Sequence, residues 1–564
     1  DSGRFPTLFI AAALQGLGVG LVQAQMAQFV FWFMLPGFSM YYLMAGLYHG
    51  EHRRLARMAA VLFYMFNLWL ISNWLGYKEP LIAAVAILPF LLGIWIRTFA
   101  ADREYLCAVL VSGLVSLAAS PIGNNSSEML AALLPLTLLF VGAALASARS
   151  RRIATLLRVT WAGLALGALT FALHAFWIVP EFAGIRSTLA AADILEFQRT
   201  SSQFLEGQSL YTSVTNNVRF VSDWTWYQGL VDPYRTFVAG FLGSRILTSL
   251  GWLIFGVVVL GAVLGRGRQK GVFIALTAIG LVLGAGLNSP VGPLYAWAVD
   301  NVPLLWIVRS PWFKFTLLTV LGYSVLLGLA TPFLVRLAKF TLTRIVGVWS
   351  EPVARRGALV CTFAVFLAIG PVYAYPFTLG LAFATPAERT FLNPNHVEPP
   401  DYVYQAADWL NNQPGDFRIM TIPGDAPWLS DWGYGGFGSF LQSLTARPGV
   451  FKRTPQSVKV SQGAPDLSGE LVDQIDADLL DERSEQVSSL LSRLGIKYLV
   501  HERDVRYDFY SSFGFRVSDS PENVQRILEE APGITLVETF GQWDIYEISD
   551  PRPRLEIASS MVAV

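Results

Sequence analysis

The chain has 564 residues, of which 53% are apolar, 13% are aromatic and only 15% are charged. Soluble domains carry about 25% charged residues, so this composition points to lipid and excludes a disordered chain. Forty-one basic and 41 acidic side chains cancel, which excludes a polybasic nucleic-acid-binding protein and predicts no nucleic-acid partner.

The first 27 residues are apolar and glycine-rich, and Gln15, Gln23 and Gln25 interrupt them. Two interpretations remain open for this segment. The favoured one is a surface or re-entrant helix that keeps Asp1 outside, because the next span must run inward. The other is an eleventh span, which would put Asp1 in the cytoplasm.

Apolar stretches recur along the next 350 residues, each of roughly 16–23 residues and long enough to cross about 30 Å of hydrocarbon as a helix. Lipid offers no hydrogen-bond partners, so the backbone must be satisfied within each helix. The predicted fold class is therefore an α-helical polytopic membrane bundle. The ten predicted spans are 28–47, 58–75, 82–97, 105–120, 128–147, 156–178, 244–264, 271–288, 312–334 and 357–379.

Basic residues concentrate in alternate short connections between these spans. This set contains Arg53, Arg54, Arg57, Arg97, Arg103, Arg149, Arg151, Arg152, Arg158, Arg266, Arg268, Lys270, Arg336, Lys339, Arg344, Arg355 and Arg356. The other short connections hold little beyond Lys78 and Arg309. Positive charge marks the cytoplasmic side of the cell (inner) membrane, so the long loop at 179–243 is predicted to lie outside.

The sequence becomes polar and proline-rich after the last span, as a linker does. We expect a membrane domain over 1–384 and a small extracytoplasmic α/β domain over 385–564. In this second domain helical and extended patterns alternate. Helices are predicted at 402–413, 484–495 and 520–533, strands at 416–423 and 496–502, and a hairpin at 534–549.

Ionisable and aromatic residues at the predicted outer boundary are the candidate site, because charges near lipid are costly and usually functional. Arginine and lysine suit a phosphate, a carboxylate suits a base, and aromatic faces suit a sugar. The competing interpretation is that such charges reach out to water and that the tryptophans form an interfacial belt. The candidates are Lys78, Glu79, Glu128, Arg219, Asp223, Trp224, Arg309 and Lys314.

Two further features have a structural interpretation as well as a functional one. His174, near the outer end of a span, is predicted to be a packed or hydrogen-bonded helix residue rather than a proton relay. The aromatic, glycine-rich segment 428–440 has residue types that bind carbohydrate, but docking on the domain core is favoured. The sequence contains neither HExxH nor GxxxxGK[ST], so we predict no metal site and no cofactor.

The order of the segments resembles GT-C type membrane glycosyltransferases, in particular the large actinobacterial arabinofuranosyltransferases. Bacterial membrane proteins that glycosylate teichoic acids share the same features. The segments that carry the resemblance are FYMFNLWLISNWLGYKEPLIAAVAILPFLL, ALHAFWIVPEFAGI, NNVRFVSDWTWY, VPLLWIVRSPWFKFTLLTVLGYSVLLGLA and LLSRLGIKYLVHERDV. The fourth is similar to an Arg-Asn-x-x-Lys-Phe motif, here Arg309 and Lys314-Phe315.

The resemblance implies an inverting transferase that uses a polyprenyl-phosphate sugar donor and a glycan acceptor for cell-envelope synthesis. Glu79 and Asp223 would be the catalytic carboxylates, while Arg309, Lys314 and Arg219 would hold the phosphate. Lys78, Trp224 and Glu128 would contact substrate. The family places its catalytic aspartate after a first membrane helix, so we expect a first span before Asp1.

Two other functions remain open. One is a non-catalytic membrane scaffold or complex subunit, with partners in a membrane complex. The other is a lipid or glycan transporter, although transporters usually carry inverted repeats and broken midplane helices, which this sequence does not display. In every case membrane lipids are expected partners.

Overall fold

The structure is a computed structural model that describes most of the chain in two compact units, one within residues 1–382 and one that includes 383–564. The described residues are 5–75, 79–124, 126–150, 152–190, 202, 205–223, 237–267, 269–302, 305–346, 350–379, 398–423, 428–436, 439–450, 471–472, 474–475, 478–479, 484–506 and 520–552.

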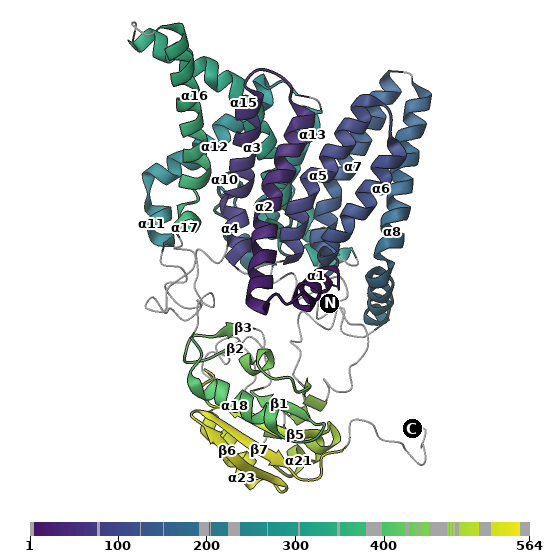
Figure 1. The fold of residues 1–564 in the computed structure, drawn as a ribbon, viewed down its shortest axis with the longest axis vertical. Helices are drawn as coiled ribbons and strands as arrows, with labels where there is room; N and C mark the ends of the chain where they lie inside the picture. The colour runs from purple at the N-terminus through teal and green to yellow at the C-terminus, as the bar shows by residue number, and fades with distance from the viewer. Residues whose placement is uncertain are drawn as a thin grey trace. The chain divides into compact units, whose positions relative to one another are not determined.

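The first unit is a bundle of apolar helices (Figure 1). Over the described ranges, eight helices are long and apolar enough to cross a membrane, and two more helices form a bent ninth candidate. With the shorter apolar helix α13, each of the ten predicted spans has a helical counterpart, as expected of a multi-pass membrane protein. The helices are α2 (Leu21–Leu47), α3 (Arg53–Met65), α4 (Leu68–Leu75), α5 (Glu79–Ala101), α6 (Tyr105–Ser116), α7 (Ser126–Arg149), α8 (Ile153–Ala190), α12 (Arg245–Leu264), α13 (Lys270–Gly284), α15 (Pro311–Val346) and α16 (Glu351–Leu367).

The span predicted at 58–75 is broken into α3 and α4, which meet at 47°. Asn67 explains the break. Its amide nitrogen donates to the carbonyls of Phe63 and Tyr64, and its amide oxygen accepts from the backbone N–H of Leu70. One side chain therefore bonds two backbone carbonyls at the end of α3 and one backbone N–H at the start of α4. The chain can bend here without leaving these groups unpaired.

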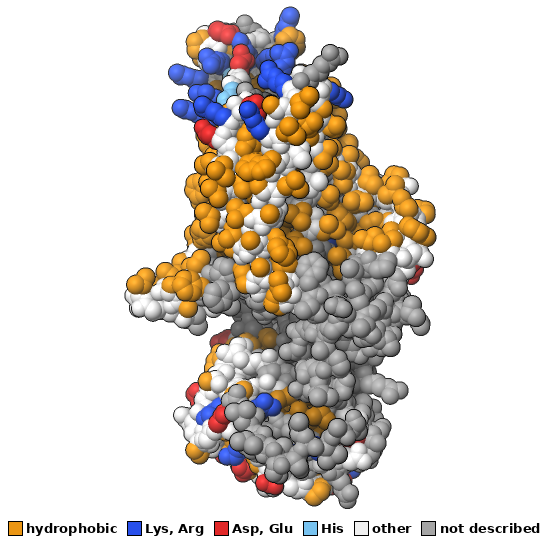
Figure 2. Space-filling model, turned by 90° about the vertical axis from the view of Figure 1, so that its right-hand side faces the viewer, with side chains coloured by type: hydrophobic (Ala, Val, Ile, Leu, Met, Phe, Trp, Pro, Cys, Tyr) orange, Lys and Arg blue, Asp and Glu red, His pale blue; other side chains and the backbone are white. Residues whose placement is uncertain are grey.

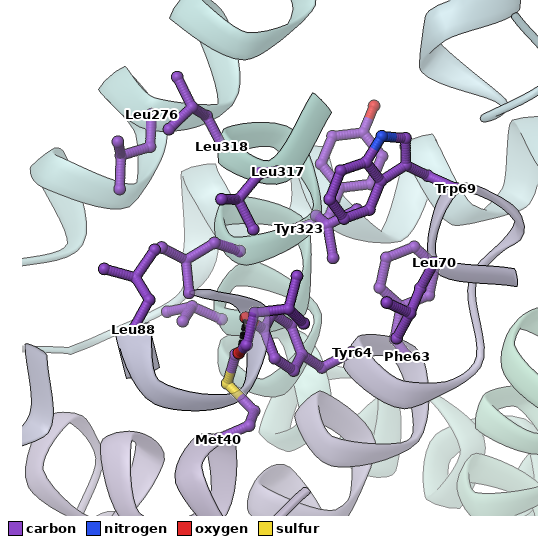
Figure 3. Packing of buried hydrophobic residues seen from close by; sticks show 14 of the residues in the cluster. Met40, Phe63, Tyr64, Trp69, Leu70, Leu88, Leu276, Leu317, Leu318 and Tyr323 are labelled. Atoms are coloured by element: carbon purple, nitrogen blue, oxygen red, sulfur yellow. Dashed lines mark hydrogen bonds between the residues drawn. The ribbon is translucent and has the colours of Figure 1, made fainter. Parts of the chain in front are cut away.

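Helices α5 and α15 form the centre of the bundle. In the most apolar 18-residue stretch of each helix, 89% of α5 and 83% of α15 is buried, whereas only 17% of the peripheral helix α8 is buried. Figure 3 shows Leu317 and Tyr323 of α15 in the same cluster as Leu88 of α5 and Tyr64 of α3. A methyl group on Gly261 of α12 would lie 1.9 Å from the carbonyl oxygen of Leu326, so this glycine lets α12 approach α15 closely.

Lysine and arginine side chains gather at one end of the bundle, beyond a wide apolar belt (Figure 2). The connections α2–α3, α5–α6, α7–α8, α12–α13 and α15–α16 all lie at this end. Helix α1 (Phe5–Gly16) packs on α2 and on the 3-10 helix η2 (Leu117–Asn124), which follows α6 at the opposite end. Its 12 residues span about 18 Å, so α1 fits the predicted surface helix and is too short to cross.

The second unit is built on a five-stranded sheet with the order β4-β1-β5-β7-β6. Strand β1 runs parallel to β4 and β5, whereas β7 runs antiparallel to β5 and β6. One face packs on α18 (Asp401–Asn412), and the other on α21 (Ser484–Arg493) and α23 (Pro521–Glu530). The strands are β1 (Arg418–Ile422), β4 (Gly449–Val450), β5 (Ile496–Glu502), β6 (Ile534–Phe540) and β7 (Trp543–Ile548).

Local sequence signals account for these elements. The hydroxyl of Ser520 accepts from the backbone N–H of Asn523 and caps α23, as its Ser-Pro start predicts. Helix α21 ends before Gly495, which has a φ of 69° and suits the left-handed position after a helix. Strand β5 is buried along almost its whole length, which explains its continuous apolar run.

Candidate functional site

Two predicted site residues meet as a buried ion pair at the end of the bundle away from the basic connections. Glu128 lies in the first turn of α7 and Lys314 in the first turn of α15. The Nζ atom of Lys314 donates to Oε1 of Glu128 at 3.0 Å, and the two side chains are 11% and 5% exposed respectively. The structure thus brings together groups that are 186 positions apart.

The helix dipole stabilises one of these two charges and destabilises the other. A carboxylate in the first turn of a helix is favoured by the helix dipole, whereas a cation there is disfavoured. Glu128 therefore suits the N-terminus of α7, but Lys314 is unfavourably placed at the N-terminus of α15 and loses most of its water as well. A buried ammonium is costly unless an anion lies close to it, and Glu128 is that anion.

Arg309 lies two residues before the start of α15, directly after the 3-10 helix η5 (Leu305–Val308). The carbonyl of Val308 accepts a hydrogen bond from the hydroxyl of Tyr295 at 2.6 Å, which holds the backbone beside Arg309. Partial burial lowers the pKa of the Arg309 guanidinium, but arginine remains protonated at any physiological pH. Arg309 and Lys314 are therefore two cations within about two turns of each other.

Arg219 follows the short helix α10 (Val214–Val218) and is held by other elements. Its Nη2 donates to Oδ1 of Asn216 at 3.0 Å, and its carbonyl accepts from the hydroxyl of Tyr373 at 2.8 Å. The aliphatic part of the side chain lies beside Gly251 of α12. These contacts do not join Arg219 to the Glu128–Lys314 pair.

The segment that carries Arg219 and Asp223 nevertheless packs close to the start of α15. A methyl group on Gly284, at the end of α13, would lie 3.2 Å from Nδ2 of Asn217 and 3.3 Å from Oγ1 of Thr316. Asn217 is two residues before Arg219, and Thr316 is two residues after Lys314. Asp223 is 2% exposed, so this carboxylate is enclosed by protein.

The remaining candidates are not tested. Lys78 and Trp224 lie outside the residues that the structure describes. Glu79 begins α5, and only its backbone belongs to the described part. Their roles remain predictions.

His174 is a hydrogen-bonded helix residue, as predicted. Its Nδ1 accepts from the indole N–H of Trp177 at 2.9 Å, and its Nε2 lies 3.0 Å from the hydroxyl of Ser116. Because an indole nitrogen only donates, the proton of the neutral ring is on Nε2. His174 therefore ties α8 to α6.

In the second unit, the described aromatic side chains of 428–440, which are Trp432, Tyr434 and Phe440, dock on the domain core. The indole N–H of Trp432 donates to Oδ2 of Asp504 at 2.7 Å, and the hydroxyl of Tyr402 donates to the same oxygen at 2.8 Å. Oδ1 of Asp504 accepts from the indole N–H of Trp543 at 2.9 Å. Burial raises the pKa of Asp504, and these three hydrogen bonds oppose the increase.

Asp504 was not among the predicted residues, although its position gives a usable signal. It lies two residues after the buried strand β5, where a polar side chain needs partners. Trp432, Tyr402 and Trp543 come from three distant segments, so their convergence on one carboxylate could not be deduced from local sequence. This network supports the structural interpretation of 428–440 rather than a carbohydrate site.

Comparison with known proteins agrees with the fold. The family model of the α-(1→3)-arabinofuranosyltransferase N-terminal GT-C domain matches residues 8–559. The solved structure of arabinofuranosyltransferase AftD from Mycobacteria is similar, with a TM-score of 0.53 and 18% identity over 95% of this chain and 34% of that chain. A mutant of AftD gives 0.52 and 17%, over 95% and 36% of the two chains.

The chain thus spans about a third of the length of these solved relatives. No curated protein matches it significantly in sequence. The family match nevertheless covers nearly every residue, including the ends of α7 and α15 that carry Glu128 and Lys314. The chain therefore belongs to the family of the N-terminal GT-C domain of α-(1→3)-arabinofuranosyltransferases.

Proposed function

We propose that this chain is the membrane glycosyltransferase domain of a cell-envelope enzyme. It takes a sugar, with arabinofuranose as the leading candidate, from a polyprenyl-phosphate donor and transfers it to a glycan acceptor. Family membership supports this class of reaction. The observation that carries the proposed site is the buried Lys314–Glu128 pair with Arg309 nearby.

The orientation follows from charge. The connections rich in arginine and lysine share one end of the bundle (Figure 2), and such connections face the cytoplasm. The starts of α7 and α15 are then at the outer face of the cell membrane. In this orientation α16 runs outward, and we infer that the second unit, which comes after it in the chain, is extracytoplasmic.

In the proposed reaction, a carboxylate takes the proton of an acceptor hydroxyl as its oxygen attacks the anomeric carbon of the donor. The bond between that carbon and the phosphate oxygen breaks, and polyprenyl phosphate leaves with the electron pair. Lys314 and Arg309 stabilise the charge that develops on the phosphate. Asp223 and Glu79 are the candidate bases, and Glu128 holds Lys314 in place.

The test is sugar transfer from a lipid-linked donor by the full-length protein in membranes. Arg309→Ala is expected to lower the rate about 10- to 100-fold, because a hydrogen bond to a charged group contributes about 1.5–3 kcal/mol. Arg245→Ala is the matched control, since Arg245 is an exposed arginine at the start of α12, at the same end of the bundle. A wild-type rate for Arg309→Ala would refute the phosphate role. Absence of transfer by the wild type with every donor tested would favour the non-catalytic subunit.

A further inference from the structure

Helices α3, α15 and α16 pack together, and their segments at the basic end of the bundle are rich in arginine and lysine. The cations of this region are Arg53, Arg54, Arg57, Arg336, Lys339, Arg344, Arg355 and Arg356. We call the outer part of it the α15–α16 surface, defined by Arg336, Arg344, Arg355 and Arg356 together with the exposed residues Leu337, Phe340 and Val353.

The length of α15 places this surface beyond the hydrocarbon. The helix has 36 residues, or about 54 Å, against about 30 Å of hydrocarbon in a bilayer. Its first two thirds are apolar and buried in the bundle, and Arg336 opens the last third. An ion pair between Lys339 and Glu351 joins the end of α15 to the start of α16. The surface is thus a continuous part of the fold at the level of lipid headgroups.

Two arginines of this surface, Arg336 and Arg355, act electrostatically on the same neighbouring side chain. That side chain is His52: burial is the main cause that lowers its pKa, Glu51 opposes this shift, and Arg355 and Arg336 lower the pKa to a smaller extent. Over the described ranges, none of the four arginines of the surface forms an ion pair. Crowded like charges repel, and an anion brought from outside relieves the repulsion.

Exposed apolar side chains alternate with these arginines. Leu337 is 48% exposed, Phe340 is 58% exposed and Val353 is 44% exposed. The guanidinium of Arg344 lies over the ring of Phe340, 5.4 Å from its centroid. A soluble anion would satisfy the arginines and leave these apolar groups in water, whereas a lipid offers a phosphate and an acyl chain together.

We propose that the α15–α16 surface binds the headgroups of anionic phospholipids in the membrane leaflet opposite the Glu128–Lys314 pair. The arginines take the phosphates, and Leu337, Phe340 and Val353 lie against the upper acyl chains. Each arginine near an anionic membrane surface contributes about 1 kcal/mol. The binding does not depend on the proposed transfer reaction.

The experiment compares the full chain in nanodiscs of phosphatidylcholine alone and with 30% phosphatidylglycerol, a fraction on the order that gives a clear surface charge. Retained phosphatidylglycerol is counted by native mass spectrometry, and the melting temperature is measured in both discs. The wild type is expected to retain phosphatidylglycerol and to melt at a higher temperature with it. Replacing Arg336, Arg344, Arg355 and Arg356 by glutamine is expected to weaken retention at least about tenfold.

The matched control replaces four basic residues of the α5–α6 and α7–α8 connections by glutamine: Arg103, Arg149, Arg152 and Arg158. It removes the same charge from the same end and is expected to keep the bound lipid. A second variant with lysine at the four positions of the surface retains the charge and should restore binding, which separates lost binding from misfolding. Equal loss in the surface and control variants, or equal protection of the wild type by inorganic phosphate, would overturn the proposal.

Discussion

Glu128 in the first unit, here called the membrane unit, and Asp504 in the second unit are both buried carboxylates, but their hydrogen-bond partners differ. Glu128 faces the ammonium of Lys314, which itself lies at an unfavourable helix end. Asp504 accepts three hydrogen bonds from neutral side chains. Burial of a charge alone therefore does not identify a functional site. A cation kept where the fold disfavours it indicates a function, whereas a carboxylate saturated by neutral donors indicates a structural connection.

Lys314→Met should have the largest effect, because it leaves Glu128 buried without its cation. Breaking a buried pair in this way costs about 3–5 kcal/mol. The double variant Lys314→Met/Glu128→Met should recover most of that stability without recovering sugar transfer. Lys339→Met is the control, because its partner Glu351 is 70% exposed and the loss should stay within about 1 kcal/mol. Recovery of transfer in the double variant would make the pair purely structural.

Asp504→Ala should come next, because the two buried indoles of Trp432 and Trp543 and the half-buried hydroxyl of Tyr402 lose their acceptor at once. Each unsatisfied buried donor costs about 1–3 kcal/mol, so the second unit should lose at least about 2 kcal/mol and become sensitive to limited proteolysis. Asp408→Ala removes an exposed aspartate from α18 and should have almost no effect. If both variants resisted proteolysis equally, the central role of Asp504 would be wrong.

Glycine substitutions test the packing of the membrane unit without changing any charge. Gly261→Ala places a methyl group against the carbonyl of Leu326, and overpacking of this kind costs about 1–3 kcal/mol. Gly256→Ala, on the same helix α12, meets nothing within 4 Å and should be neutral or slightly stabilising. Thermal unfolding in detergent measures both, and a Gly261 variant as stable as the Gly256 variant would contradict the close approach of α12 and α15.

Within about one pH unit below 6.5, the smallest effect is the response of the second unit to acid. Burial, assisted by Arg503, lowers the pKa of His501 to about 3, while an unfolded histidine titrates near pH 6.5. Below pH 6.5 the unfolded chain binds a proton at this histidine and the folded chain does not. The free energy of unfolding therefore falls as the pH is lowered to about 3, by up to about 1.4 kcal/mol per pH unit. Amide exchange of β5, corrected for intrinsic chemistry, should follow this slope, and His501→Gln should flatten it. An unchanged slope in that variant would mean that another group titrates.

The sequence predicted the membrane unit well because each span must be apolar and long, and because basic residues mark alternate connections. The ten apolar stretches, the hairpin at β6 and β7, and strand β5 follow from composition and period. The break at Asn67 could not be predicted in this way, because its three side-chain hydrogen bonds form only in the folded helix pair. The resemblance to GT-C arabinofuranosyltransferases is confirmed by the family match.

The candidate site was predictable as a set of residues and not as a set of contacts. The sequence placed Glu128 and Lys314 in separate turns that were predicted to lie outside, and only the packing of α7 near α15 makes them a pair. Arg219 belonged to the same set, but its contacts are with Asn216, Tyr373 and α12. Long-range pairing of this kind depends on helix packing, which a single sequence does not encode locally. The limits of the two domains and the catalytic roles of Glu79 and Asp223 stay predictions.

Binding of polyprenyl phosphate to the membrane unit shows whether the buried Lys314 contributes to a phosphate site. The comparison is between the wild type and Lys314→Met/Glu128→Met, which is expected to keep the fold while removing the buried cation. We expect the double variant to bind polyprenyl phosphate at least about tenfold more weakly, the loss expected for one charge-assisted contact to a phosphate. Equal affinity of the two proteins would contradict it.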